Sequence, residues 1–290
     1  MERMIHKKYN IETLGSKNVA RVLRCLVHQP HMLRSVMEIS NDLGISRSNV
    51  YRAVKSIEQL GLVIQIKDGK KKLYKTDISS RLAVKFFEIF TQERFMNLPS
   101  RLNNILSTFP QSVLGCDAMI LFGSYANGLA HESSDIDICC VCENEEAKTK
   151  IKKLSRKYYP DFRFEIHFYN KQALENLNDF VILDSLLNGI PFVGADLVFH
   201  HLARIQNFPK AYMLYRLQKC EDYVRKINSV SGPAKKYFQD LVNISIGEIN
   251  SVLKFKRTVP KKDIKKVNAV KAIEHLHDEI ARRGDAIWLI

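Results

Sequence analysis

The sequence has no long hydrophobic run and no arrangement of cysteines typical of a zinc site. No stretch approaches the ~18 apolar residues of a membrane-spanning helix, and no basic and then apolar leader opens the chain. The six cysteines are not spaced as paired zinc ligands, and three of them crowd residues 139–142. We therefore expect a soluble, cytoplasmic protein without a membrane partner, in which the cysteines are small buried thiols. A regulatory thiol cluster is the alternative.

An excess of acidic residues is also missing, except in the middle of the chain. The 290 residues carry a formal net charge of +14, divided as +9 over residues 1–95, −3 over 96–195 and +8 over 196–290. Lys and Arg that neutralise phosphates supply most of the affinity of a protein for nucleic acid. Two basic flanks around an acidic middle therefore favour an anionic polymer as partner, although charge that serves only solubility is the alternative. The length suggests two or three domains.

Two apolar runs, 119–122 and 138–141, frame a glycine turn and a pair of acids. Gly123 and Ser124 end the first run, and Asp135 and Asp137 open the second, which predicts a strand, a turn, a short helix and a strand. The period of two places both carboxylates on one face of the strand. Because close carboxylates repel each other, we expect a divalent cation between them, and Mg²⁺ suits carboxylates combined with phosphate oxygens.

The glycine turn suits the phosphates of a nucleotide. Gly123 has no side chain to block a phosphate, and Ser124 offers a hydroxyl and a backbone N–H near a helix start. The motif therefore predicts a site for a metal-bound nucleoside triphosphate. A solvated acidic turn is the alternative, but it does not explain acids inside an apolar strand.

The pattern G-S-x10-D-x-D between two hydrophobic strands resembles the signature of the DNA polymerase β-like nucleotidyltransferases, most closely their minimal branch. The resemblance covers about residues 98 to 195. It implies transfer of AMP from ATP to an acceptor hydroxyl, with Mg²⁺ or Mn²⁺ and release of pyrophosphate. It also implies that Asp135 and Asp137 are catalytic metal ligands and that Gly123, Ser124 and Ser134 bind the nucleotide. The acceptor is unknown from the sequence.

A third acid follows on a segment that alternates apolar and polar residues, 162–168. Its one carboxylate is Glu165, 28 residues after Asp137. In the resembling family a carboxylate on this strand completes the metal site and takes the proton of the attacking hydroxyl. Glu165 matches that position, although Asp is common there. The alternative for Glu165 is a pair with Arg163. His167 could approach the triphosphate or the acceptor, but an ordinary surface or core histidine is favoured.

The first 77 residues resemble a winged helix-turn-helix domain. We expect three helices followed by a hairpin around Asp68-Gly69, with the helices and strands near residues 16–27, 36–43, 46–60, 62–67 and 70–76. In such a domain the third helix enters the major groove of double-stranded DNA, and lysines on the wing contact phosphates. The expected DNA-binding residues are Arg47, Ser48, Asn49, Arg52, Lys67, Lys70, Lys71 and Lys72. Docking of a protein is the alternative use of this surface.

Residues 78–97 have apolar positions at helical spacing, Leu82, Phe86, Ile89 and Phe90. They predict a linker helix whose apolar stripe is buried against a neighbouring domain or a second subunit, so we expect a homodimer. From residue 196 onward the pattern is all helical. A basic run in this part is an alternative contact for nucleic acid or triphosphate: Lys254, Lys256, Arg257, Lys261, Lys262, Lys265 and Lys266.

The expected fold class is α+β with several domains. It comprises a winged helix (1–77), a linker helix (78–97), a nucleotidyltransferase α/β core with a mixed sheet (98–195) and a C-terminal helical bundle (196–290). The leading hypothesis is a DNA-binding nucleotidyltransferase. Two alternatives are a transcription regulator that senses a nucleotide without chemistry and an antitoxin-like enzyme that adenylylates a protein.

Overall fold

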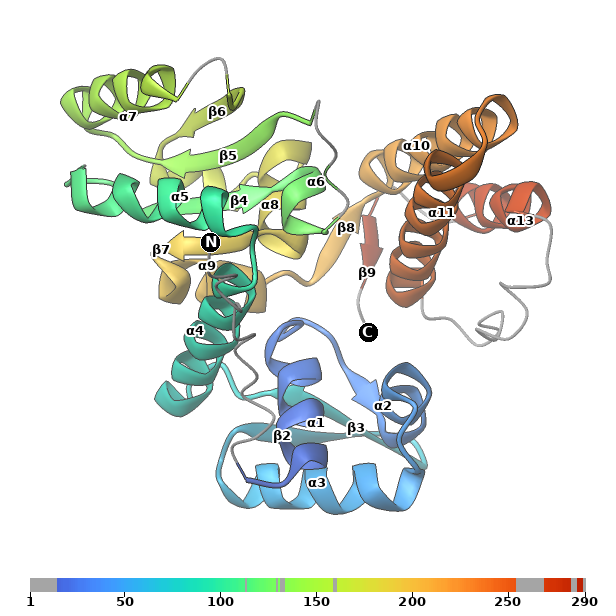
Figure 1. The fold of residues 1–290 in the computed structure, drawn as a ribbon. Helices are drawn as coiled ribbons and strands as arrows, with labels where there is room; N and C mark the ends of the chain where they lie inside the picture. The colour runs from blue at the N-terminus through green and yellow to red at the C-terminus, as the bar shows by residue number, and fades with distance from the viewer. Residues whose placement is uncertain are drawn as a thin grey trace, which may run out of the picture. The chain divides into compact units, whose positions relative to one another are not determined.

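The computed structural model describes residues 15–112, 114–128, 130, 134–158, 161–253, 269–282 and 286–288 (Figure 1). The chain divides into two compact units. The first comprises 1–176 and 181–205, and the second comprises 177–180 and 206–290. The domain boundaries expected from the sequence stay a prediction. Within the described ranges no helix is long and apolar enough to cross a membrane.

The N-terminal part of the first unit is a helix-turn-helix followed by a hairpin. Its elements are α1 (Lys17–Val27), β1 (Arg34–Ser35), α2 (Val36–Leu43), α3 (Arg47–Gln59), β2 (Val63–Asp68) and β3 (Lys71–Thr76), with the strands in the order β1-β3-β2. The apolar positions at helical spacing in α1, α2 and α3 are buried together, as the sequence predicts. The hairpin turn differs by one residue. Asp68 pairs with Lys71, so the turn consists of Gly69 and Lys70, and Gly69 adopts a φ of 55°.

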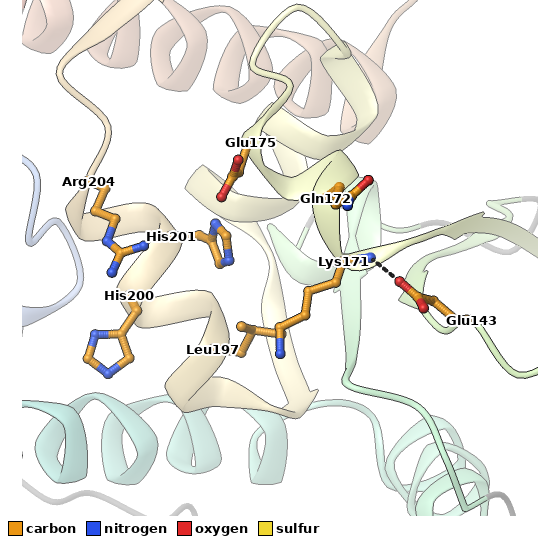
Figure 2. Close-up of a pocket in the computed structure, with 8 residues that line it drawn as sticks. All are labelled: Glu143, Lys171, Gln172, Glu175, Leu197, His200, His201 and Arg204. Carbon is orange, nitrogen blue, oxygen red and sulfur yellow. Dashed lines mark hydrogen bonds between the residues drawn. The ribbon is translucent and has the colours of Figure 1, made fainter.

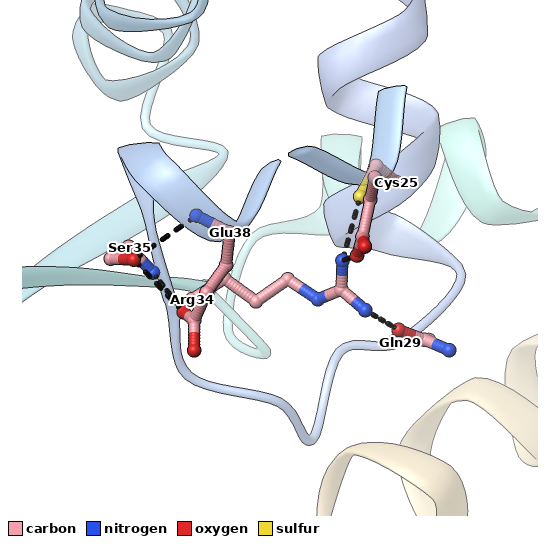
Figure 3. Close-up of polar contacts among 6 residues, drawn as sticks. Cys25, Gln29, Arg34, Ser35 and Glu38 are labelled. Carbon is pink, nitrogen blue, oxygen red and sulfur yellow. Dashed lines mark hydrogen bonds and ion pairs between the residues drawn. The ribbon is translucent and has the colours of Figure 1, made fainter. Parts of the chain in front are cut away.

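Side-chain hydrogen bonds fix the start of α2 and its neighbours (Figure 3). Ser35 and Glu38 form a capping box, in which the Ser35 hydroxyl accepts from the Glu38 N–H and the Glu38 carboxylate accepts from the Ser35 N–H. Beside it the buried guanidinium of Arg34 donates to Cys25 Sγ at 3.1 Å and to the side-chain oxygen of Gln29. It also donates to Asp42 Oδ2 at 2.6 Å. These bonds join β1 to α1 and α2.

The central part of the first unit is built on one mixed sheet. Its strands β4 (Ala118–Phe122), β5 (Ile136–Val141), β6 (Phe164–Tyr169) and β7 (Ile190–Val193) lie in the order β6-β5-β4-β7. β5 and β6 are parallel, whereas β4 is antiparallel to both β5 and β7. Helices α5 (Ser100–Ser112), α7 (Glu145–Lys157), α8 (Phe180–Asn188) and α9 (Ala195–Ala203) accompany it. The α+β fold class with a mixed sheet is confirmed.

The core of this sheet is unusually rich in thiols. All five residues of β4 are buried, and Cys139, Cys140 and Cys142 are fully buried on and just after β5. All six cysteines of the chain are free thiols, as expected, and Cys25 and Cys116 are half-buried. Cys140 and Cys142 belong to the core cluster that joins the sheet to α5, where their small side chains allow close packing.

Helix α4 (Arg81–Met96) forms where a linker helix is expected, but its buried face is different. Ala83, Phe87 and Phe90 are buried, whereas Leu82 and Ile89 are 46% and 41% exposed. Phe90 is thus buried as expected, whereas Leu82 and Ile89 are not buried within the chain, and their burial against a second subunit stays a prediction. Both stripes are apolar at helical spacing, so the period alone does not decide which of them faces the core. Phe87 contacts Phe199 of α9, with ring centroids 5.3 Å apart.

The second unit contains three described helices and a small sheet. The helices are α10 (Lys210–Ser229), α11 (Gly232–Leu253) and α13 (Ala269–Ala281). The strands β8 (Asn207–Pro209) and β9 (Ala286–Trp288) pair antiparallel, so the all-helical prediction from residue 196 is wrong here. Such short strands are specified by pairing between distant residues, and no local periodicity reveals them. The basic run between Lys254 and Lys266 lies outside the described residues.

Candidate active site and DNA-binding surface

The glycine turn packs against one of the predicted carboxylates. Gly123 directly follows β4 and begins α6 (Gly123–Ala126), with a φ of 69°. A Cβ placed on Gly123 would lie 2.2 Å from Asp137 Oδ2. The carboxylate thus occupies the space that any side chain at residue 123 requires, and Phe122 pairs with Asp137 across β4 and β5. Only glycine fits both the backbone conformation and this contact.

The structure brings Asp137 and Glu165 side by side on neighbouring strands. They are in register on the parallel pair β5 and β6, and in-register residues project from the same face of a sheet. Asp137 is half-buried, between the fully buried Ile136 and Ile138. Asp135 is exposed and lies directly before β5, which begins one residue later than the sequence suggests. Ser134, half-buried, precedes it, and Ser124 is half-buried on α6.

Glu165 contacts His167, two residues along the same strand. Glu165 Oε1 lies 3.3 Å from His167 Nε2, and the Glu165 side chain is 60% exposed. The His167 ring lies 5.8 Å from that of Phe122, between centroids. Period two places Glu165 and His167 on the same face of β6, so the histidine belongs to the carboxylate cluster. From the sequence, an ordinary surface or core histidine is favoured for His167, whereas the structure places it beside Glu165.

The donor atoms of this cluster fit Mg²⁺ in their chemistry. Among the described residues no group of three His, Cys, Asp or Glu lies close enough to hold a metal ion by itself. Mg²⁺ does not require such a group, because one or two carboxylates combine with substrate phosphate oxygens and water to complete its ligands. The neighbouring oxygens of Asp137 and Glu165 fit that set. The ligand assignment, including Asp135, stays a prediction.

Arg94 of α4 is a site residue that the sequence analysis misses. Its guanidinium donates to the backbone oxygens of Asn188 and Gly189, each at 3.0 Å, and of Ala126 at 3.4 Å. Ala126 ends α6, which Gly123 begins. Burial lowers the pKa of Arg94 to about 10, so it stays charged near neutral pH.

The predicted DNA-binding residues lie on two adjacent elements of the helix-turn-helix domain. At the start of α3, Arg47, Ser48 and Arg52 are exposed, and Arg52 Nη2 donates to Asn49 Oδ1 at 2.7 Å. Ser46 caps this helix, and its hydroxyl accepts from the Asn49 N–H at 3.4 Å. The four predicted lysines of the hairpin are all exposed: Lys67, Lys70, Lys71 and Lys72.

Two of these lysines face each other across the hairpin. Lys67 is in register with Lys72, and Lys71 is in register with Asp68. Like charges directly opposite each other on a hairpin are destabilising. A polyanion bound at this surface would relieve the repulsion between Lys67 and Lys72. The other pair, Lys71 and Asp68, combines opposite charges.

A separate pocket lies beyond the opposite ends of β5 and β6 (Figure 2). Its volume is about 580 Å³, and it is lined by Glu143, Lys171, Gln172, Glu175, Leu197, His200, His201 and Arg204. Glu143 follows β5, and Lys171 begins the 3-10 helix η2 (Lys171–Glu175) after β6. At about 3.3 Å per residue, the four steps from Asp137 to the end of β5 span about 13 Å. The pocket is therefore distinct from the carboxylate cluster. Its walls carry charges of both signs.

Comparison with protein families assigns both parts of the first unit. Residues 100–187 match the nucleotidyltransferase domain, and residues 17–66 match the IclR helix-turn-helix domain. A search of curated proteins finds no match to the chain. The first match contains Gly123, Asp137 and Glu165, and the second contains α1, α2, α3 and most of β2. The chain therefore joins an IclR-type helix-turn-helix domain to a nucleotidyltransferase domain, an architecture that supports a DNA-binding nucleotidyltransferase.

Proposed function

We propose that the protein is a DNA-binding nucleotidyltransferase that transfers AMP from ATP to an acceptor hydroxyl and releases pyrophosphate. The observation that carries the proposal is the pair of in-register carboxylates, Asp137 and Glu165, beside the glycine turn. Carboxylates packed against a turn without a side chain suit a triphosphate that must approach the backbone closely. The nucleotidyltransferase family match over residues 100–187 supports the class of reaction.

In this reaction the acceptor oxygen attacks the α-phosphorus of ATP. The bond between that phosphorus and the oxygen bridging to the β-phosphate breaks, and pyrophosphate leaves with the electron pair. The Glu165 carboxylate takes the proton of the acceptor hydroxyl. Asp137 and Glu165, with Asp135 as a further predicted ligand, would hold Mg²⁺ or Mn²⁺, which would neutralise phosphate charge and make that hydroxyl more acidic.

The remaining site residues would position the nucleotide. Gly123 and Ser124 hold the β- and γ-phosphates through backbone N–H groups and the hydroxyl, and the Ser134 hydroxyl adds a further donor. Holding both reactants in line supplies much of the acceleration in such a reaction. Asp137 has a second task, because its carboxylate packs on Gly123 and so fixes the turn.

The helix-turn-helix domain would bring this chemistry to double-stranded DNA. Arg47, Ser48, Asn49 and Arg52 at the start of α3 contact base edges in the major groove. The lysines of the hairpin contact phosphates, and the opposed pair Lys67 and Lys72 supports this role. We further propose a homodimer through the exposed stripe of α4 that contains Leu82 and Ile89. DNA binding and six free thiols support a cytoplasmic protein.

The test uses ATP labelled at the α-phosphate, MgCl₂ and a cell lysate that is afterwards separated into protein, nucleic-acid and small-molecule fractions. We expect one fraction to gain label while pyrophosphate is released. Asp137→Asn should lower the rate about a thousandfold, since it removes several kcal/mol of charge stabilisation. Asp161→Asn is the matched control, because Asp161 is an exposed acid of the same unit, paired with Arg101. Full activity of Asp137→Asn would refute the mechanism.

The outcome also separates the proposed enzyme from its alternatives. Binding of ATP without release of pyrophosphate would identify a regulator that senses a nucleotide. Label in the protein fraction alone would identify an enzyme that adenylylates a protein partner. Label in nucleic acid or in a small molecule would identify the acceptor class directly.

A further inference from the structure

Arg94 is a half-buried residue whose guanidinium binds only main-chain oxygens among its described hydrogen-bond partners. These oxygens belong to two segments, the end of α6 at Ala126 and the connection from α8 to β7 at Asn188 and Gly189. In the described part of the chain no carboxylate pairs with Arg94. Burying a charge in this way is costly unless its donors are satisfied. The planar guanidinium satisfies them by joining three carbonyls.

The residue next to Arg94 on α4 faces the helix-turn-helix domain. The buried carboxylate of Glu93 forms an ion pair with Arg24 of α1, and Arg24 also lies over the ring of Phe90 at 5.2 Å. The ring of His28, directly after α1, lies about 6 Å from both Phe87 and Phe90. Thus α4 is fixed to α1 by an ion pair and by aromatic contacts.

The two sets of contacts form one continuous chain of packed groups. It runs from the glycine turn through α6, Arg94, α4 and Glu93 to Arg24 on α1, and α1 packs on α3. We propose that Arg94 is a positioning residue for the Gly123 turn, and that α4 couples nucleotide binding at this turn to DNA binding by α3. The inference rests on the proposed function, because it takes the turn to be the nucleotide site.

The coupling has a direct physical basis. A triphosphate that binds the turn through Gly123 and Ser124 favours one arrangement of α6, and α6 ends at the carbonyl that Arg94 holds. A shift of that carbonyl changes the hydrogen bonds of the Arg94 guanidinium, and α4, which carries Arg94, must move with it. Because Glu93 and Arg94 are adjacent, the same movement reaches Arg24. By thermodynamic linkage the effect is reciprocal, so DNA changes nucleotide affinity by the same factor.

The first experiment measures this factor in the full chain. DNA affinity is measured by fluorescence anisotropy, with a labelled duplex pool of random sequence, with and without MgCl₂ and an ATP analogue whose α,β-bridge is a methylene. Affinity for the analogue is measured by calorimetry with and without the duplex. We expect both affinities to change by one common factor of about fivefold or more.

Variants of the ion pair locate the coupling. Arg24→Met should bring the factor close to one while both separate affinities stay within about twofold of the wild type. Arg24→Met removes the ion pair of a buried carboxylate, which can itself destabilise the fold. The double variant Arg24→Met, Glu93→Met therefore provides the same test with two apolar side chains in place of the ion pair. Arg101→Met is the control, because it removes an exposed arginine whose ion pair is with Asp161 and not with Glu93.

A second experiment separates a positioning role of Arg94 from a purely structural one. Arg94→Lys keeps the charge but not the planar fork, so we expect a KM for ATP about tenfold higher, with kcat changed less than threefold and the melting temperature nearly unchanged. Arg94→Met should raise KM further, so that lysine gives partial rescue. Equal KM values in all three proteins would overturn this part of the inference.

The two ways in which the inference can fail are distinct. If wild-type protein binds both the analogue and DNA but neither affects the other, the coupling is refuted and the proposed function stands. If the analogue does not bind at all, the proposed function fails, and the coupling fails with it.

Discussion

Gly123 is subject to two constraints at the same atom. Its φ of 69° disfavours any residue with a side chain, and the space where a Cβ would lie is taken by the Asp137 carboxylate. Gly128 has the same φ of 69°, but nothing lies within 4 Å of its Cβ position. Comparison of the two positions therefore separates the effect of backbone strain from the effect of a clash with the Asp137 carboxylate.

Substitution of each glycine by alanine tests this distinction. Both variants should lose about 1 kcal/mol of unfolding free energy from backbone strain. Gly123→Ala should in addition displace Asp137 and lower nucleotidyl transfer at least a hundredfold, whereas Gly128→Ala should retain most of the activity. Urea denaturation and the labelled-ATP assay measure the two effects. Equal activities of the two variants would show that the contact with Asp137 has no catalytic importance.

The residues of the site differ in how well the sequence reveals them. Gly123, Asp137 and Glu165 are found by spacing and alternation, because neighbouring strands fix which residues come together. Arg94 is not found in this way. Its partners are backbone oxygens 32 to 95 residues away, and a backbone oxygen leaves no trace in the sequence.

We propose that the elements of the helix-turn-helix domain divide the contacts with DNA between them. The start of α3 presents side chains of the types that can form hydrogen bonds with base edges, whereas the hairpin presents exposed lysines. Lysine neutralises phosphates whatever the sequence, so the hairpin should supply affinity and α3 should supply specificity.

This division predicts the salt dependence of DNA binding. Lys72→Gln should lower the slope of log K against log salt concentration by about 0.9 and weaken binding to all duplexes alike. Lys85→Gln, with the same change of charge on α4, should leave the slope unchanged, since Lys85 pairs with Glu88. Anisotropy titrations at several salt concentrations measure the slope. An unchanged slope for Lys72→Gln would remove the hairpin from the DNA-binding surface.

The contact between α1 and α4 carries a dependence on pH. Burial, and then the charges of Arg94 and Arg24, lower the pKa of His28 to about 3 from its usual 6.5. Below pH 6.5 the unfolded chain therefore binds a proton that the folded chain does not. The contribution of neutral His28 to the unfolding free energy is therefore fully present above pH 6.5. It falls by up to about 1.4 kcal/mol per pH unit between pH 6.5 and pH 3.

Urea denaturation near pH 7 and about pH 5 measures this loss. From His28 alone the wild type should lose about 2 kcal/mol of unfolding free energy between the two conditions. The loss of unfolding free energy should be smaller by about this amount in His28→Gln. His200→Gln, which changes an exposed histidine of α9, should behave as the wild type. An equal loss in His28→Gln and the wild type would contradict the shifted pKa.

Some elements follow from local signals and others do not. The start of α3 at Ser46 is predicted by its cap, and the hairpin is predicted by Gly69, although its turn lies one residue later. On α4 the sequence predicts the buried Phe90 but not the buried Ala83 and Phe87, because two apolar stripes compete. The pairing of β8 with β9 depends on residues far apart in the chain.

The distribution of charge over the N-terminal and middle segments fits the proposed function. The acidic middle segment contains the carboxylate cluster, and the basic N-terminal segment contains the surface predicted to bind DNA. A net charge of +14 attracts DNA over long distances, but it does not set the number of subunits. That number depends on apolar surface such as the exposed stripe of α4.

The proposed dimer is tested by charge placed on this stripe. Leu82→Glu should convert a dimer into monomers and weaken binding to a two-fold DNA site, because a carboxylate would be buried at the interface. Leu114→Glu changes an 87% exposed leucine outside α4 and should leave the dimer intact. Sedimentation velocity measures the mass. A wild-type protein that sediments as a monomer would contradict the proposal.

The backbone partners of Arg94 have a consequence for sequence variation. Every residue type supplies the same carbonyl oxygen, so position 188 can exchange its side chain without losing its hydrogen bond to Arg94. Packing restricts the other two partners, because Ala126 is buried in the core and a Cβ on Gly189 would meet the backbone oxygen of Ser185. Saturation mutagenesis scored by DNA-dependent activity should therefore find position 188 tolerant and positions 94, 126 and 189 intolerant. Chemistry would conserve one residue of this junction, and the shape of its surroundings would conserve two more.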